Sequence, residues 1–233
     1  APHTFALAAT SIGLAIIVAL LTAYVATLPG GGALRSFFRA LPSFMVSLPG
    51  FWIAILLLQF FSFQLGWVNV VDPTPLEGLI LPSLTLAVPM AAPLMQVLIR
   101  SIDEVRAQPF VQVIRARGAS EARIFWRDVL RNSLLPAITM AGLLFGELVG
   151  GAVVTETVFG RAGLGSLTVN AVSSRDMPVL LGVVLIAATA YVLINLIVDL
   201  LYPVLDVRLR DAGQQSSKAK KSTAQAAVKE GAR

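Results

Sequence analysis

Three acidic residues lie inside long apolar stretches of this 233-residue chain: Glu147, Glu156 and Asp199. An ionisable side chain at membrane depth is costly unless it is paired or faces a cavity, so each acid is a candidate for a translocation pathway. Glu147 lies nearest the middle of its stretch, among glycines whose small surfaces permit close helix approach. Its position fits an interhelical pair and a cavity-facing role equally.

The other two acids favour structural roles. Asp199 lies near the end of its stretch, and Asn195 is four residues earlier, so both lie on one helix face. This spacing favours hydrogen bonds in helix packing over pathway lining. Glu156 is followed by VFGRAGLG, whose glycines permit a tight turn. A structural role is again favoured over a place in the pathway.

Catalytic and nucleotide-binding motifs are missing from the sequence. It has no Cys, a single His at position 3 and no H-E-x-x-H helix, which argues against an intramembrane enzyme. It also has no G-x-x-x-x-G-K-[ST] loop, the motif that cradles nucleotide phosphates. We therefore expect no catalytic residue, no metal site and no cofactor bound by this chain itself.

The elements that carry these acids are membrane helices. Hydrophobic residues make up 56% of the chain, charged residues 13%, and the mean hydropathy is +0.80, which a water-soluble fold could not hide. Crossing the hydrocarbon layer takes roughly 20 apolar residues in a helix. The sequence predicts an all-α integral membrane domain over residues 1–210, with spans at about 4–28, 41–63, 79–99, 133–157 and 178–205.

Proline distinguishes the third predicted span from the others. Pro82, Pro89 and Pro93 would break an ordinary helix but are tolerated where neighbouring helices satisfy the freed backbone groups. We expect a kinked or interrupted helix there.

The basic residues predict the orientation. All of the 18 Lys and Arg except Arg161 and Arg175 fall in alternate connections or after the last span. Because positive charge is retained on the cytoplasmic side, the C-terminus is predicted to be cytoplasmic and residue 1 to lie outside. Five crossings with residue 1 outside imply an odd number of helices upstream, and one such helix would bring the total to six. The polar tail at 211–233 is predicted to be disordered, with lysines that could touch anionic lipid.

The connection at 100–132 is long, basic and still amphipathic. Its apolar residues follow helical spacing up to Gly118, and Ser120 restarts the pattern as an N-cap with Glu121 in the first turn. This pattern predicts two short helices around a glycine elbow, with Phe125 and Trp126 as anchors for a partner. A protein partner and a hairpin lying on lipid remain open on these residues alone.

A longer run of sequence resembles a known family. RARGASEARIFWRDVLRNSLLPAITMAGLLFGELVGGAVVTETVFGRAGLG is similar to the cytoplasmic loop and following helix of permease subunits in binding-protein-dependent ABC importers, in the dipeptide/oligopeptide/nickel branch. LPGFWIAILLLQFFSFQLGW and RDMPVLLGVVLIAATAYVLINLIVDLLYPVLDVRLR resemble the third and last helices of that branch. The resemblance covers roughly residues 40–210, and it implies that the first helix lies upstream.

This resemblance implies that the loop couples the permease to a cytoplasmic ATPase. The residues that would do so are Arg115, Gly118, Ala119, Ser120, Arg123, Phe125, Trp126, Arg127 and Arg131. It also implies a second permease, two ATP-binding subunits that hold ATP and Mg²⁺, an external solute-binding protein and membrane lipid, with no nucleic acid. The expected location is the cytoplasmic membrane of a bacterium or archaeon.

The sequence departs from the pattern of that family in two places. Gln112, Val113 and Ile114 stand where it favours Glu-Ala-Ala, and Asp128 stands where the branch commonly has His. A secondary transporter driven by an ion gradient is the alternative, because a proline-broken helix and buried acids also occur there. It does not predict the long basic loop. The solute, whether dipeptide, longer peptide, glutathione, nickel complex or heme, cannot be read from the sequence.

Overall fold

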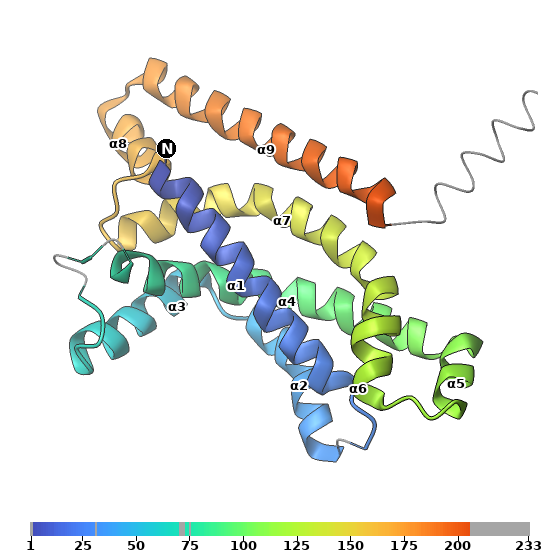
Figure 1. The fold of residues 1–233 in the computed structure, drawn as a ribbon. Helices are drawn as coiled ribbons and strands as arrows, with labels where there is room; N and C mark the ends of the chain where they lie inside the picture. Colours follow the sequence, from blue (N-terminus) through green and yellow to red (C-terminus); the bar gives the residue numbers. More distant parts are fainter. Residues whose placement is uncertain (1, 31, 70–72, 75, 206–233) are drawn as a thin grey trace, which may run out of the picture.

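The computed structural model describes residues 2–30, 32–69, 73–74 and 76–205, and every regular element in these ranges is helical (Figure 1). The predicted all-α fold is confirmed for this part of the chain, while the tail at 211–233 lies outside it. The elements are α1 (Pro2–Thr27), α2 (Gly32–Val46), α3 (Gly50–Leu57), the π-helical η1 (Leu58–Gln64), α4 (Glu77–Arg106), α5 (Pro109–Ala116), α6 (Glu121–Arg123), the π-helical η2 (Ile124–Val129), α7 (Leu130–Val158), α8 (Leu164–Ser174) and α9 (Met177–Leu205).

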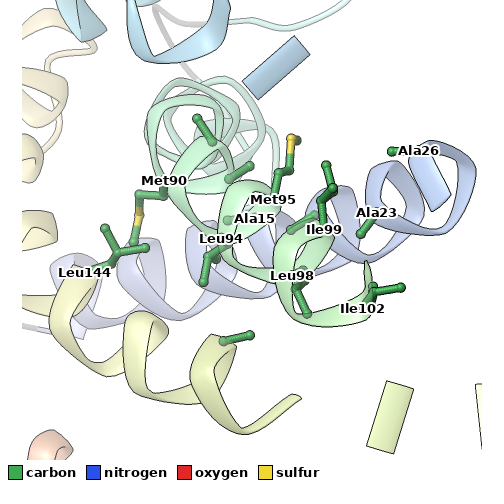
Figure 2. Packing of buried hydrophobic residues seen from close by; sticks show 14 of the residues in the cluster. Ala15, Ala23, Ala26, Met90, Leu94, Met95, Leu98, Ile99, Ile102 and Leu144 are labelled. Carbon is green, nitrogen blue, oxygen red and sulfur yellow. The ribbon is translucent and has the colours of Figure 1, made fainter. Parts of the chain in front are cut away.

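The core forms where α1 lies against α4. Small residues follow one another every fourth position along α1 and are buried: Ser11, Ala15, Ala19, Ala23 and Thr27. This spacing places them on one face, where small side chains let two helix backbones approach closely. Larger side chains of α4, including Leu94, Met95 and Leu98, pack at this contact, and Leu144 of α7 lies beside Met90 of α4 (Figure 2).

The second predicted span is bent. The arms Gly32–Val46 and Gly50–Gln64 meet at 104°, so the prediction of one continuous helix over 41–63 is wrong. Pro49 is the physical reason, because it has no N–H to continue α2 and it disfavours a helical conformation at the preceding residue. Its own backbone is extended, with φ −64° and ψ 132°, and it starts α3 in a new direction.

The third predicted span is a continuous helix. α4 passes through Pro82, Pro89 and Pro93 without a break, so of the two predicted outcomes the interruption is wrong, and the kink stays a prediction. α4 is enclosed by α1, α2, α3 and α7, the kind of surroundings in which prolines are tolerated inside a membrane helix. α4 also extends past residue 99, so the first residues of the 100–132 connection continue this helix.

Among the described residues, three helical stretches are long and apolar enough to cross a membrane: α1, α4 and Met177–Leu200 of α9. The bent pair would be a fourth if its two arms form one span. α7 is 29 residues long and contains the predicted span at 133–157, but it does not belong to this set. The total of five crossings therefore stays a prediction.

The chain reverses direction between α8 and α9. Arg175 ends α8 in the left-handed conformation, with φ 57°, and α9 then runs back beside α7 (Figure 1). Most of α9 is exposed in the single chain, including Leu181, Leu185 and Leu200. An apolar face of this size requires lipid or another apolar helix to cover it.

Candidate functional site

The connection between α4 and α7 folds as a hairpin around Gly118. α5 ends at Ala116, and Gly118 then has φ +81°, the left-handed conformation that the sequence predicted there. The Ser120 Oγ accepts a hydrogen bond from the Arg123 backbone N–H at 3.4 Å, which confirms the predicted N-cap. A Cβ at Gly118 would meet no atom within 4 Å, so its backbone conformation, rather than crowding, requires glycine there.

The second helix of the hairpin is not a separate element. α6 passes through η2 directly into α7, so the prediction of two short helices is wrong for the second one. Residues 121–133 contain no Gly or Pro that would end the helix. The hairpin is therefore attached directly to α7, the helix that carries Glu147 and Glu156.

Phe125 belongs to the core rather than to the surface. It is 0% exposed, and its ring lies edge-on against Tyr24 of α1 with centroids 4.8 Å apart. The guanidinium carbon of Arg106 lies 5.9 Å from the same ring centroid, within cation–π range. Because α1 already covers the side chain, this burial speaks against the predicted role of Phe125 as a partner anchor.

Glu121 joins three helices through its two carboxylate oxygens. Oε2 accepts from Arg106 Nη1 at the end of α4, at 3.2 Å, and Oε1 accepts from Arg115 Nε in α5, at 2.7 Å. Arg115, predicted to contact a partner, is thus engaged within the chain, although 48% of its side chain is exposed. The shared carboxylate fixes the hairpin against the end of α4.

A second charged link, which sequence reasoning missed, lies nearby. Arg39 of α2 donates through Nη2 to Asp103 Oδ2 at 2.7 Å and through Nε to the carbonyl oxygen of Ala26 at 3.0 Å. Arg39 thus connects the middle of α2 to the C-terminal ends of α1 and α4. Two single charges 64 residues apart carry no local pattern that would have revealed the pair.

The remaining predicted residues separate by exposure. Gly118 and Ser120 are exposed, whereas Ala119 is partly buried against the core. Four arginines and one aromatic residue form an exposed set, which we call the hairpin surface: Arg117, Arg123, Trp126, Arg127 and Arg131. Trp126 is 49% exposed. Arg117 was not predicted as a site residue, although its place beside Gly118 could have indicated it.

Glu156 anchors the opposite end of α7. It is 1% exposed, and its Oε1 accepts from the Thr4 hydroxyl of α1 at 2.6 Å. Its Oε2 accepts from the backbone N–H groups of Gly165 and Ser166, in the first turn of α8, at 2.7 and 3.2 Å. A carboxylate at a helix N-terminus pairs with free N–H groups and with the positive end of the helix dipole. Glu156 is thus a link between α1, α7 and α8.

The glycines after Glu156 make this contact possible. A Cβ on Gly163 would overlap the Glu156 carboxylate, and a Cβ on Gly165 would lie 2.5 Å from the Cα of Val153. Gly160 turns the chain with φ +61°. The close packing around Glu156 and Val153 therefore requires Gly163 and Gly165, whereas the backbone conformation of the turn favours glycine at 160.

Arg161 holds the same loop against α4. Its Nη1 donates to the carbonyl oxygen of Gly78, which lies four residues before Pro82. Since proline has no N–H, Pro82 cannot make the helical hydrogen bond to that carbonyl, and Arg161 takes its place. Burial lowers the pKa of Arg161, and the charge of nearby Glu156 opposes that shift.

The other two acids lie in different surroundings. Glu147 is exposed in the single chain and lines a cavity of about 360 Å³ with residues of α3 and α4. Asp199 is exposed on α9, and the Asn195 amide donates to the carbonyl oxygen of Tyr191 at 2.9 Å. Among the described residues, no group of three His, Cys, Asp or Glu could hold a metal ion.

Similarity to known proteins points to one family. Residues 11–211 match the family described as binding-protein-dependent transport system inner membrane component. The chain is 39% identical over 165 residues to the glutathione transport system permease protein GsiC of Escherichia coli strain K12, and equally so to GsiC of Salmonella choleraesuis strain SC-B67. The match covers 71% of this chain and 54% of each relative, so the chain spans about half the length of these relatives.

Solved structures share the fold. The inward-facing MetNI methionine ABC transporter has a chain that superposes with a TM-score of 0.73 at 18% identity, covering 88% of this chain and 93% of that one. An amino acid ABC transporter with histidines gives 0.63 at 15% identity, covering 85% and 89%. From the family match over residues 11–211, we conclude that the chain belongs to the binding-protein-dependent transport system inner membrane components.

Proposed function

We propose that this chain is a permease subunit of an ATP-driven importer and that it forms the translocation pathway with a second permease. Its proposed solute is glutathione or a small peptide, in line with the glutathione permeases to which it is 39% identical. Two ATPase subunits bind ATP and Mg²⁺, and an external binding protein delivers the solute. The complex lies in the cytoplasmic membrane of a bacterium or archaeon, with the C-terminus and the hairpin in the cytoplasm.

The observation that carries this proposal is the hairpin surface. No ion pair engages Arg117, Arg123, Arg127 or Arg131 within the part of the chain that the structure describes. Arginines around an exposed tryptophan form a surface that suits a protein partner with acidic groups. Glu121 and Phe125 fix the backbone behind this surface, so little ordering would be required when a partner binds.

The burial pattern favours a protein partner over a lipid-bound hairpin. A helix that lies on a membrane inserts its apolar face among the lipids. Here the apolar residues Ile124, Phe125 and Val129 are 0% exposed and already pack inside the chain. The face left open carries exposed arginines around Trp126.

The test is ATP hydrolysis by the complete transporter in liposomes. We expect solute together with its binding protein to stimulate hydrolysis in the natural protein. Replacing Arg123 and Arg127 together by Gln should reduce that stimulation about tenfold, because both charges would leave the interface. Arg100→Gln is the matched control, since Arg100 is 84% exposed but lies on α4, away from the hairpin surface.

Two results would contradict the proposal. Full stimulation in the Arg123 and Arg127 double variant would show that the hairpin surface does not contact the ATPase. Uptake that continues without ATP and stops when the ion gradient is removed would identify a secondary transporter instead.

A further inference from the structure

The cavity beside Glu147 lies between α3, α4 and the C-terminal half of α7. Its walls include Phe51 of α3, Thr85 and Pro89 of α4, and Gly151 and Thr155 of α7. A volume of about 360 Å³ falls within the usual size of small-molecule sites. Since no Gly, Ala or aliphatic side chain can bind a polar group, the few polar atoms in these walls decide what the cavity could hold.

Glu147 is the one charged residue among those that line this cavity. Within the described part of the chain, no hydrogen bond or ion pair reaches its carboxylate, in contrast to the fully bonded carboxylate of Glu156. A carboxylate at membrane depth is costly without a cation or water beside it. Something outside this chain must therefore compensate its charge.

The prolines of α4 remove helical hydrogen-bond donors beside the cavity. Pro89 cannot donate to the carbonyl of Thr85, and Pro93 cannot donate to the carbonyl of Pro89, because proline has no N–H. Both Thr85 and Pro89 line the cavity. Thr85 itself is 1% exposed and its hydroxyl donates to the carbonyl oxygen of Leu81 at 2.9 Å, so Thr85 offers a solute little beyond packing.

The Glu147 carboxylate accepts hydrogen bonds and carries the negative charge of the cavity. A primary ammonium group offers three donors, no acceptor and a positive charge, so it complements this carboxylate. A carboxylate or phosphate ligand would instead be repelled by Glu147. The apolar remainder of the wall suits the uncharged body of a small solute.

We propose that this cavity is a subsite for the primary ammonium group of the transported solute, with Glu147 as its counter-ion. The inference rests on the proposed function and narrows it to solutes that carry a free amino group. Glutathione and unmodified peptides both do.

The charge preference of the cavity can be measured without transport. Val154 lines the cavity and is 45% exposed, and the chain has no natural cysteine. Val154→Cys in the assembled transporter is treated with two thiol reagents, 2-aminoethyl methanethiosulfonate, which carries a primary ammonium, and its 2-sulfonatoethyl counterpart. The ratio of the labelling rate with the ammonium reagent to that with the sulfonate reagent should fall about tenfold when Glu147→Gln is added, because a full negative charge leaves the cavity.

Val113→Cys is the matched control. Val113 is 51% exposed on α5, in the hairpin and away from the cavity, so its rate ratio should not respond to Glu147→Gln. An unchanged ratio at Val154→Cys would overturn the proposal. Failure of both reagents to label Val154→Cys would also overturn it, since the cavity would then be closed to solutes. A rise in ammonium labelling after Glu147→Gln would show instead that Glu147 is neutralised by a cation of a partner subunit.

Uptake of L-alanyl-L-alanine by the complete transporter gives the second readout. Glu147→Gln should lower the maximal rate about tenfold, while Glu147→Asp, which keeps the charge, should lower it less. Glu104→Gln, an exposed acid on the cytoplasmic end of α4, should transport normally. Loss of ATP-dependent uptake in the natural protein would refute the proposed function, whereas the labelling ratio decides the ammonium subsite independently.

Discussion

Replacing Gly165 by alanine should separate α8 from α7. The added Cβ would lie 2.5 Å from the Cα of Val153, where ordinary contact begins at 3.4 Å, so the two helices must move apart by about 1 Å. Neither atom can rotate away, because one is a backbone atom and the other is fixed to the backbone. The hydrogen bonds from the N–H groups of Gly165 and Ser166 to Glu156, now 2.7 and 3.2 Å, would then be broken.

The cost follows from these two bonds. A hydrogen bond to a charged group contributes about 1.5–3 kcal/mol, so losing both should destabilise the subunit by roughly 3–6 kcal/mol. For a chain of this size, such a change lowers the unfolding midpoint by about 10 °C. The assay is the temperature at which the detergent-purified protein loses its monodisperse peak in gel filtration.

Gly182→Ala provides the matched control for this comparison. A Cβ at Gly182 of α9 would meet no atom within 4 Å, and glycine in a helix interior is less favourable than alanine by about 0.5–1 kcal/mol. This variant should be as stable as the natural chain or slightly more so. Equal midpoints for Gly165→Ala and Gly182→Ala would refute the argument that α8 depends on close approach to α7.

Three further predictions concern other parts of the chain. Phe125→Ala should destabilise the purified subunit by about 3–5 kcal/mol, because it leaves a cavity against Tyr24. Trp126→Ala should lower the thermal midpoint less, because Trp126 is half-exposed although its ring contacts Tyr24 and Phe125, and it should weaken ATPase retention in pull-down. The reverse order of midpoints would contradict the burial described above. Arg161→Met should lower the thermal midpoint, since the Gly78 carbonyl would lose its donor at a cost of about 1–3 kcal/mol. An impermeant thiol reagent added to intact cells should label Ser173→Cys but not Ser120→Cys, and labelling of Ser120→Cys would invert the predicted topology.

The sequence was sufficient for features that depend on local chemistry. Apolar content and spacing predicted helices, and the Gly118 and Ser120 pair predicted the turn and the cap that the structure contains. The four-residue repeat of small residues from Ser11 to Thr27 was also readable, although it was missed. It marks the face of α1 that lies on α4.

Features that depend on distant partners could not be read. Nothing near Glu156 indicates that Thr4, 152 residues earlier, donates to it. The apolar stripe with Phe125 was assigned to a partner because its cover, Tyr24, lies on another helix. The bend at Pro49 was missed for a different reason: the lack of charge between Arg39 and Asp72 suggested one span and outweighed the local proline signal.

The contact between Arg161 and the Gly78 carbonyl has a consequence for how this family can vary in sequence. Arg161 donates to the Gly78 carbonyl oxygen that would otherwise accept from the backbone N–H of residue 82, so positions 82 and 161 are not independent. A substitution of Pro82 that restores a backbone N–H would return the Gly78 carbonyl to its own helix, and Arg161 would lose its acceptor. Homologous chains should therefore keep proline and arginine together or lose them together, and such paired change would be visible in sequences alone.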